Sequence, residues 1–378
     1  MVMRTLVVGG TGPTGPFIVN GLRERGREVT IFHRGTHEVP EIPDDVTHIH
    51  GDPHFAETIA EALDGHTFDE VIASYGRIRL IAEALAGKAG RFVSVGGVPV
   101  YRGFGNPDLL TPRGLTAPVA EDAPKARDEA GEHFGTLILQ TEEAVFEHHP
   151  TATVFRYPYV YGPYQLVPRE WCVVRRILDG RRQILLPDGG TQLSTHAWAG
   201  NLGHAVLAAI DQPEASAGKA YNCGDVDQLT LTQIVEVIGQ ALGSEIQPVA
   251  VPWEVAGPAK AITPAGRHHL LLDLSQLRGD LGYTDALPAP KALAQVARWY
   301  VDNPPDVSFE ERLGDPFDYA WEDRMLEQLS STMAQLRQAS RREGDDDGLA
   351  VNDEGGTFRP HPYAHPKDAG QLRDQRGR

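Results

Sequence analysis

The chain has 378 residues, a length that suits two domains or one large domain with an appendage. Its 35 Lys and Arg residues stand against 52 Asp and Glu residues, and the net charge of −17 disfavours broad binding to nucleic acid. Cys172 and Cys223 lie far apart, without metal-binding or redox spacing. The sequence has no apolar run long enough to span a membrane and no leader-like start, so we expect a cytoplasmic protein without membrane association.

The first third of the chain alternates strand-like and helix-like segments. Short apolar, β-branched runs predict strands at 5–8, 28–32, 46–50, 70–74 and 91–95. Helical spacing of apolar residues predicts helices at 17–25, 56–63 and 80–85. Alternation of this kind, with short links, predicts an α/β fold in which crossover helices join the strands of a doubly wound parallel sheet.

The middle of the chain predicts a smaller lobe. Residues 99–130 are rich in Pro, Gly and charge, which indicates a long loop. A helix at 132–148 and a strand at 153–156 follow, with further helices at 233–242 and 291–300. We therefore divide the chain into a nucleotide-binding domain at 1–164, which also receives parts of 190–230, and a mixed α/β substrate lobe with closing elements at 165–303.

The composition changes again in the extension at 304–378. Five apolar residues share one face of a helix predicted at about 320–341: Met325, Leu326, Leu329, Met333 and Leu336. We expect this face to pack on the body or on a second subunit. The polar tail at 342–378 is expected to be flexible or to lie on the surface, and the sequence suggests no role for it.

A glycine-rich turn follows the first strand. Gly9, Gly12 and Gly15 are spaced three residues apart, and Thr14 comes directly before the third glycine. Such a turn brings backbone N–H groups close to a pyrophosphate at the amino end of a helix. The strand before it and the helix after it supply the context that this motif requires, so we predict a dinucleotide-binding site.

The end of the second strand indicates which dinucleotide binds. An acidic residue there would accept hydrogen bonds from the adenosine ribose, but this chain has His33 and Arg34. A guanidinium group pairs with a 2′-phosphate, so NADP is favoured and NAD is the alternative. Asp52, after the third strand, suits an adenine amino group or is a plain turn residue before Pro53.

With these segments in place, the chain resembles the extended short-chain dehydrogenases/reductases of the NAD-dependent epimerase/dehydratase type over residues 3–303. The matching segments, besides the glycine turn, are 91–101, 155–163, 220–224 with 229–232, and 281–283 with 296–300. The resemblance implies a Rossmann-type sheet and a small-molecule substrate, and it leaves open a homodimer formed through a two-helix face. It also places Ser74, Pro158 and Tyr159 among the cofactor contacts.

The chain departs from this family at the catalytic positions. Hydride-transfer members use a Tyr, a Lys four residues later and a Ser or Thr, because the Lys and the nicotinamide lower the pKa of the phenol. The family pattern places Gly97, Phe134 and Ile138 at these three positions. Tyr363 with Lys367 repeats the Tyr–Lys spacing, but Pro366 lies between them, so chance explains the match.

Several residues are candidates to replace the missing acid–base pair. We predict a catalytic role for Tyr101, His133 or Tyr161, with surface or capping roles as the alternative for His133. Tyr101 is expected to face the substrate. Tyrosines near the nicotinamide either donate a proton or wall an apolar pocket; they are Tyr157, Tyr159, Tyr161 and Tyr164. Nearby residues either contact substrate or are solvated; they are Arg169, Glu170, Arg175, Arg176 and His196.

The histidines do not predict a metal site. The adjacent pairs His148–His149 and His268–His269 point in diverging directions, without a carboxylate at helical ligand spacing. His48, His50 and His54 come together after the third strand, but we interpret them as unliganded.

Three functions fit these observations. The favoured one is an NAD(P)-dependent oxidoreductase or epimerase/dehydratase-type enzyme that acts on a small carbonyl or hydroxyl substrate with a non-standard acid–base group. The alternative is a non-catalytic NADP-binding sensor or scaffold, which the loss of all three catalytic groups would suit. Some chloroplast proteins on this scaffold act on RNA, but the net charge of −17 disfavours that function here.

Overall fold

The computed structural model describes residues 2–264 and 266–340. The chain forms two compact units, of which the first ends at Tyr319 and the second begins at Ala320. The division predicted at residues 164 and 303 remains a prediction.

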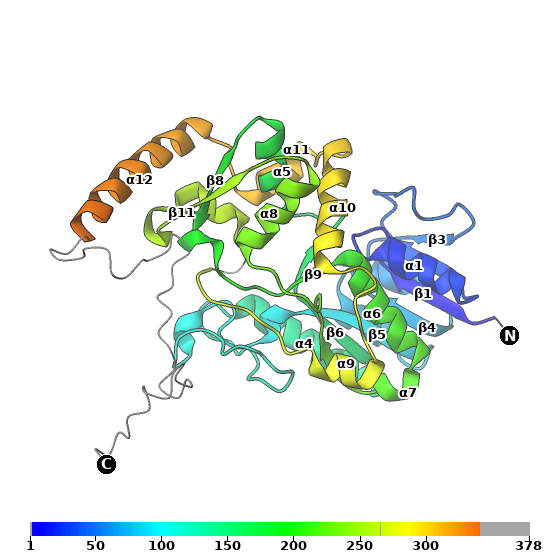
Figure 1. Ribbon diagram of the computed structural model, residues 1–378. Helices are drawn as coiled ribbons and strands as arrows, with labels where there is room; N and C mark the ends of the chain where they lie inside the picture. The colour runs from blue at the N-terminus through cyan, green and yellow to red at the C-terminus, as the bar shows by residue number, and fades with distance from the viewer. Residues whose placement is uncertain (1, 265, 341–378) are drawn as a thin grey trace, which may run out of the picture. The chain divides into compact units, whose positions relative to one another are not determined.

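A seven-stranded parallel sheet forms the centre of the first unit (Figure 1). Its strands, in spatial order, are β3 (Thr47–His50), β2 (Glu28–His33), β1 (Arg4–Val8), β4 (Phe68–Ala73), β5 (Ala89–Gly97), β6 (Thr153–Tyr157) and β10 (Lys219–Asn222). The predicted doubly wound sheet is therefore confirmed. The strand order reverses between β1 and β4, and ligands of such sheets bind at the carboxyl ends of the strands beside this reversal.

Helices cover both faces of the sheet. Successive side chains of a strand point to opposite faces, and in the central strands both sets are apolar and must be buried. Val7 of β1 packs with α1 (Gly15–Glu24) and α6 (Ala199–Asp211). Its neighbours Leu6 and Val8 pack on the opposite face. The helices of that face are α2 (Ala56–Ala62), α3 (Ile78–Ala84) and α4 (His133–His148). Burial on both faces explains why Leu6, Val7 and Val8 of β1 are apolar in succession rather than alternating with polar residues.

A second hydrophobic core lies in a smaller lobe of the same unit. Its elements are α5 (Trp171–Leu178), β8 (Gln183–Pro187), α8 (Leu231–Ala241), β11 (Gln247–Val251) and α10 (Ala289–Asp302). The strands β8 and β11 pair in parallel, and the short β7 (Tyr159–Tyr161) pairs with β9 (His196–Trp198). A capping box fixes the start of α8, because the Thr230 and Gln233 side chains each bond the backbone N–H of the other.

The remaining helices are short, apart from the last. They are α7 (Pro213–Ser216), α9 (Ser275–Leu281), α11 (Val307–Leu313) and the long α12 (Tyr319–Ser340). The helix α12 confirms the predicted helix near 320–341, whereas the surface on which its apolar face packs remains a prediction. The polar tail beyond Ser340 lies outside the described residues. Among the described helices, none combines the length and the apolar character needed to cross a bilayer.

Candidate functional site

The glycine turn lies at the reversal of strand order, between β1 and α1. The Gly9 N–H donates to the carbonyl of Phe32 in β2, at 3.0 Å. Gly9 has φ +109, a backbone conformation that favours glycine, and an added Cβ would meet Ser74 Oγ and Tyr75 Cβ at 2.9 Å. Position 9 therefore requires glycine for two reasons: its backbone conformation, and the close approach of Ser74 and Tyr75, which follow β4.

The other two glycines have different environments. A Cβ on Gly15 would lie 2.0 Å from the carbonyl oxygen of Gly10, so only glycine lets α1 begin so close to the turn. A Cβ on Gly12 would meet no protein atom within 4 Å. Gly12 is exposed, and the space above it is therefore open to a ligand at the amino end of α1.

A buried hydroxyl without a partner lies beside this turn. Tyr157 ends β6 and is largely buried, and its hydroxyl lies near Thr14 without completing a hydrogen bond to it. Burial raises the pKa of this phenol, so the hydroxyl keeps its proton at neutral pH. A buried polar group without a partner is costly, and a polar ligand over the turn would remove that cost.

The predicted adenosine-end residues occupy distinct positions. Arg34 is exposed, and its guanidinium carbon lies 5.7 Å from the ring centre of Tyr75. His33 is buried at the end of β2 and contacts His48 and His50 instead of open space. Asp52 accepts hydrogen bonds from both the backbone N–H and Nδ1 of His54, which favours its interpretation as a turn residue.

The three positions of the family's catalytic groups lie close together. An added Cβ on Gly97, at the end of β5, would lie 3.6 Å from Cδ1 of Ile138 on α4. Phe134, one turn before Ile138, has 65% of its surface exposed. Gly97 and Ile138, which the alignment to the family pattern assigns to two of the catalytic positions, thus lie in contact. Neither residue, nor Phe134, carries a group that transfers a proton.

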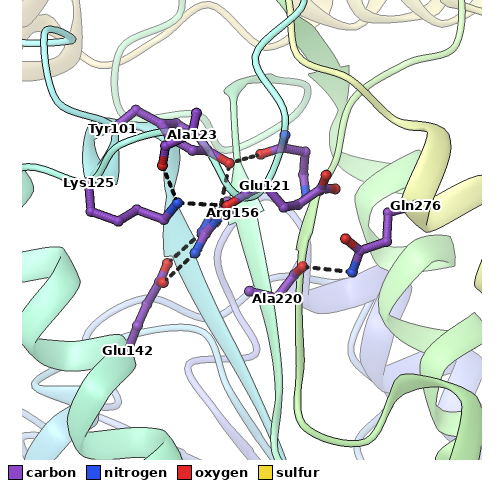
Figure 2. A network of polar contacts seen from close by, with 9 residues as sticks. Tyr101, Glu121, Ala123, Lys125, Glu142, Arg156, Ala220 and Gln276 are labelled. Carbon is purple, nitrogen blue, oxygen red and sulfur yellow. Dashed lines mark hydrogen bonds and ion pairs between the residues drawn. The ribbon is translucent and has the colours of Figure 1, made fainter.

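Tyr101 does not face a substrate, so the orientation expected from the sequence is wrong. Its side chain is fully buried, and its hydroxyl donates to Asn222 Oδ1 at 2.5 Å and accepts from Arg156 Nη1 at 3.0 Å (Figure 2). Burial raises the pKa of Tyr101 to about 12. The physical reason is a 3₁₀ turn at Val98–Val100, which follows the end of β5 before Tyr101 is reached.

The predicted tyrosine cluster does not form. Tyr161 is 1% exposed, and its hydroxyl donates to Asp225 at 2.6 Å inside the second core, so it cannot reach a substrate. The hydroxyl of Tyr164 bonds the carboxylate of Glu41. Of the three predicted catalytic residues, only His133, the exposed first residue of α4, has an accessible side chain.

A pocket of about 550 Å³ adjoins the remaining tyrosine, Tyr159. Its aromatic lining residues are Phe104, Tyr159 and Trp253. Its basic and imidazole groups belong to Arg113, Arg267, His268 and His269. The guanidinium of Arg169 lies 5.4 Å from the Tyr159 ring centre. Its aromatic wall and basic groups suit a small ligand that has both an apolar part and an anionic part.

Other predicted substrate contacts are used inside the protein. Arg176 forms a buried ion pair with Asp315, and Arg175 pairs with Asp179 and Glu310. His196 Nδ1 lies 2.6 Å from the carbonyl of Ser194, and burial lowers the pKa of this histidine to about 4. His196 is therefore neutral at physiological pH.

Glu170 provides a test of the electrostatics of this lobe. Burial raises the pKa of its carboxyl to about 7, and its Oε2 has no hydrogen-bond partner. Ionisation is thus penalised in the folded state, and the wild type loses stability as the pH rises from about 4.5 to 7. We expect Glu170→Gln to gain roughly 2–4 kcal/mol in free energy of unfolding, relative to the wild type, between pH 4.5 and pH 8.

Urea denaturation of both proteins at several pH values measures this gain. The exposed Glu143, replaced by Gln, is the control and should show no such pH-dependent difference. A difference between Glu170→Gln and the wild type that does not change with pH would show that the Glu170 carboxyl is solvated.

The chain is similar to a known protein family and to individual known proteins. Residues 76–224 match the model of the NAD dependent epimerase/dehydratase family. The chain is 25% identical over 299 residues to the chloroplast stem-loop binding protein of 41 kDa b of Arabidopsis thaliana, covering 74% of each chain. It is also 25% identical over 326 residues to a UDP-glucose 4-epimerase of Corynebacterium glutamicum, covering 75% of this chain and 91% of that one.

Solved structures of epimerase/dehydratase proteins share the fold. The UDP-glucose 4-epimerase of Thermotoga maritima, solved with UDP-glucose, superimposes with a TM-score of 0.64 at 16% identity, over 80% of this chain and 100% of that one. The enzyme WbmG of Bordetella bronchiseptica, solved in complex with NAD, gives a TM-score of 0.63 at 16% identity, over 80% of this chain and 95% of that one. The Rossmann-type α/β fold inferred from sequence is confirmed.

The sequence did not indicate two features of the first unit. One is the buried pair of Arg156 in β6 and Glu142 in α4, joined by two hydrogen bonds of 3.0 and 2.9 Å. A charged residue within an apolar strand was the available signal. The other is Lys125, whose pKa burial lowers to about 8 and whose ammonium donates to the carbonyls of Glu121 and Ala123 (Figure 2).

Proposed function

We propose that this chain binds a nicotinamide dinucleotide, NADP in preference to NAD, and acts on a small carbonyl or hydroxyl substrate as an oxidoreductase or epimerase/dehydratase-type enzyme. The open space over Gly12, at the amino end of α1 and near the unpartnered Tyr157 hydroxyl, carries the proposal. The match to the epimerase/dehydratase family and the relative solved with NAD support it.

Each part of the cofactor has a candidate partner in the chain. Backbone amides between Gly10 and Thr14 would hold the diphosphate, because the N–H groups of Gly9 and Gly15 already donate to the carbonyls of Phe32 and Gly12. Arg34 would pair with a 2′-phosphate. Pro158 and Tyr159 would lie beside the nicotinamide, close to the pocket lined by Tyr159. The bound cofactor would supply a ring that accepts or donates a hydride.

The proton must come from a group outside the usual Tyr–Lys–Ser set. We propose His133 for this role because its exposed side chain directly precedes Phe134 at the start of α4. Imidazole side chains serve widely as general acids and bases in enzymes. Tyr159, whose pKa burial raises to about 12, would keep its proton and orient a substrate.

A non-catalytic NADP-binding sensor or scaffold is the second candidate. Gly97, Phe134 and Ile138 at the catalytic positions favour it, because none of the three can transfer a proton. Both candidates require the dinucleotide site, so substrate turnover separates them.

Binding and turnover test the two candidates in sequence. Quenching or enhancement of NADPH fluorescence should reveal saturable binding to the purified chain, and a panel of aldehydes and ketones should then oxidise the bound NADPH. His133→Gln should lower the oxidation rate at least tenfold and leave NADPH affinity unchanged. Binding without oxidation of NADPH by any carbonyl compound would favour the sensor, and the absence of binding to either dinucleotide would exclude both candidates.

Arg34→Ala tests the preference for NADP. Loss of a charge-assisted contact with the 2′-phosphate should weaken NADPH binding by about 1–3 kcal/mol and leave NADH binding nearly unchanged. Fluorescence titration with both dinucleotides measures this difference. Arg4→Ala is the control, because Arg4 begins β1 at the end opposite to the turn. Equal losses for NADPH and NADH would contradict a 2′-phosphate contact.

A further inference from the structure

Three histidines gather on one face of the sheet edge formed by β2 and β3. His33, the last residue of β2, is paired in register with His50 of β3. His48 lies two residues before His50, so its side chain is on the same face of the strand. Glu38, in the loop after β2, completes a group whose four candidate ligand atoms all lie within 4.8 Å of one another.

The separations within this His/Glu cluster are close to those of a metal site. His33 Nε2 lies 2.9 Å from His48 Nδ1 and 3.5 Å from Glu38 Oε1. His48 Nδ1 lies 3.8 Å from Glu38 Oε2. Nitrogen and oxygen ligands about 2.0–2.2 Å from a tetrahedral ion are separated by roughly 3.3–3.6 Å. Small rotations of the side chains would therefore bring the four atoms to bonding distance.

The surroundings hold the cluster in place. His33 is only 4% exposed, and a Cβ on Gly35 would lie 3.0 Å from the His50 ring, so the backbone of the loop packs directly on that ring. Glu38 is the one carboxylate in the cluster and lies against His33 and His48. Among residues 2–264 and 266–340, no other group of three or more His, Cys, Asp or Glu side chains has this geometry.

We propose that His33, Glu38, His48 and His50 bind one divalent transition-metal ion of the zinc type. Imidazole nitrogens with one carboxylate oxygen suit Zn²⁺ and Co²⁺ better than Mg²⁺ or Ca²⁺, which prefer oxygen ligands. The ion would fasten the loop at 34–46 to the ends of β2 and β3. This inference goes beyond the proposed function and replaces our interpretation of the histidines as unliganded.

This site could not be predicted from the sequence. Its ligands come from two strands and a loop, and the spacing along the chain does not show that His33 and His50 are register partners. His54, which the sequence groups with His48 and His50, pairs with Asp52 instead.

Metal binding by the full, tag-free chain tests the proposal. After chelator treatment, titration with Co²⁺ should produce the visible absorption of a tetrahedral site, saturating at one ion per chain, and Zn²⁺ should abolish it by displacement. His48→Gln and His50→Gln should each weaken Co²⁺ binding at least tenfold. Both residues are incompletely buried, so these variants are expected to fold, and circular dichroism would verify it.

Two controls separate the cluster from other histidines. His54→Gln should leave the Co²⁺ titration unchanged, and so should the double variant His361→Asn/His365→Asn, which removes an i, i+4 pair from the tail. The proposal would be overturned by absence of stoichiometric binding, by unchanged binding in His48→Gln and His50→Gln, or by loss of the signal in the tail variant.

Discussion

Gly12→Val should abolish NADP(H) binding without unfolding the chain. Gly12 is outside the positive-φ glycines, and a Cβ there meets no protein atom within 4 Å, so the folded chain accepts the new side chain. The valine would fill the space that we assign to the diphosphate. We expect at least a hundredfold loss of NADPH affinity, or about 3 kcal/mol, with a change in free energy of unfolding of roughly 0.5 kcal/mol or less.

Fluorescence titration and thermal denaturation of the same variant measure the two effects. Gly15→Ala is the contrasting variant, because its Cβ would lie 2.0 Å from Gly10 O and should reduce both binding and stability. If Gly12→Val bound NADPH as well as the wild type, the diphosphate would not lie over Gly12, and the basis of the proposed function would be lost.

Arg156→Met should cause the largest loss of stability of any single substitution considered. Arg156 and Glu142 are each 6% exposed and form two hydrogen bonds, while Arg156 Nη1 also donates to Tyr101 and to the Glu121 carbonyl (Figure 2). Removing the guanidinium leaves the Glu142 carboxylate buried without its cation. Such a change costs about 3–5 kcal/mol.

Urea denaturation at neutral pH checks this expectation. Arg23→Met is the matched control, because Arg23 pairs with Asp45 on the surface, where ion pairs contribute about 0–1 kcal/mol. The double variant Arg156→Met/Glu142→Met should recover much of the loss, since no unpaired charge then remains. Equal effects of Arg156→Met and Arg23→Met would show that the buried pair is accessible to water.

Local patterns were sufficient to predict the sheet but not the directions of individual side chains. The apolar runs of β1, β2 and β4 differ in pattern from the helices that flank them, so the strands could be predicted. The alignment to the family's catalytic positions also placed Gly97 and Ile138 together, and they lie in contact. The position of Tyr101 depends on the 3₁₀ turn before it and on Asn222, a residue 121 positions away along the chain. Contacts at such sequence separation are set by tertiary packing, which periodicity does not reveal.

The same limit applies to the tyrosines and histidines. Tyr157 and Tyr161 are close in sequence, yet one faces the glycine turn and the other enters the core of the smaller lobe. The cluster of His33, Glu38, His48 and His50 depends on strand register, which follows from how β2 and β3 pair.

The pairing of β10 with β6 makes residues 1–164 structurally dependent on later parts of the chain. A fragment ending at residue 164 would lack β10 and α6, leaving β6 as a bare edge and uncovering the apolar face around Val7. It would also leave the Tyr101 hydroxyl without Asn222. A minimal folded version of this sheet would therefore require either residues 199–222 grafted in place or a new strand and helix designed to close it.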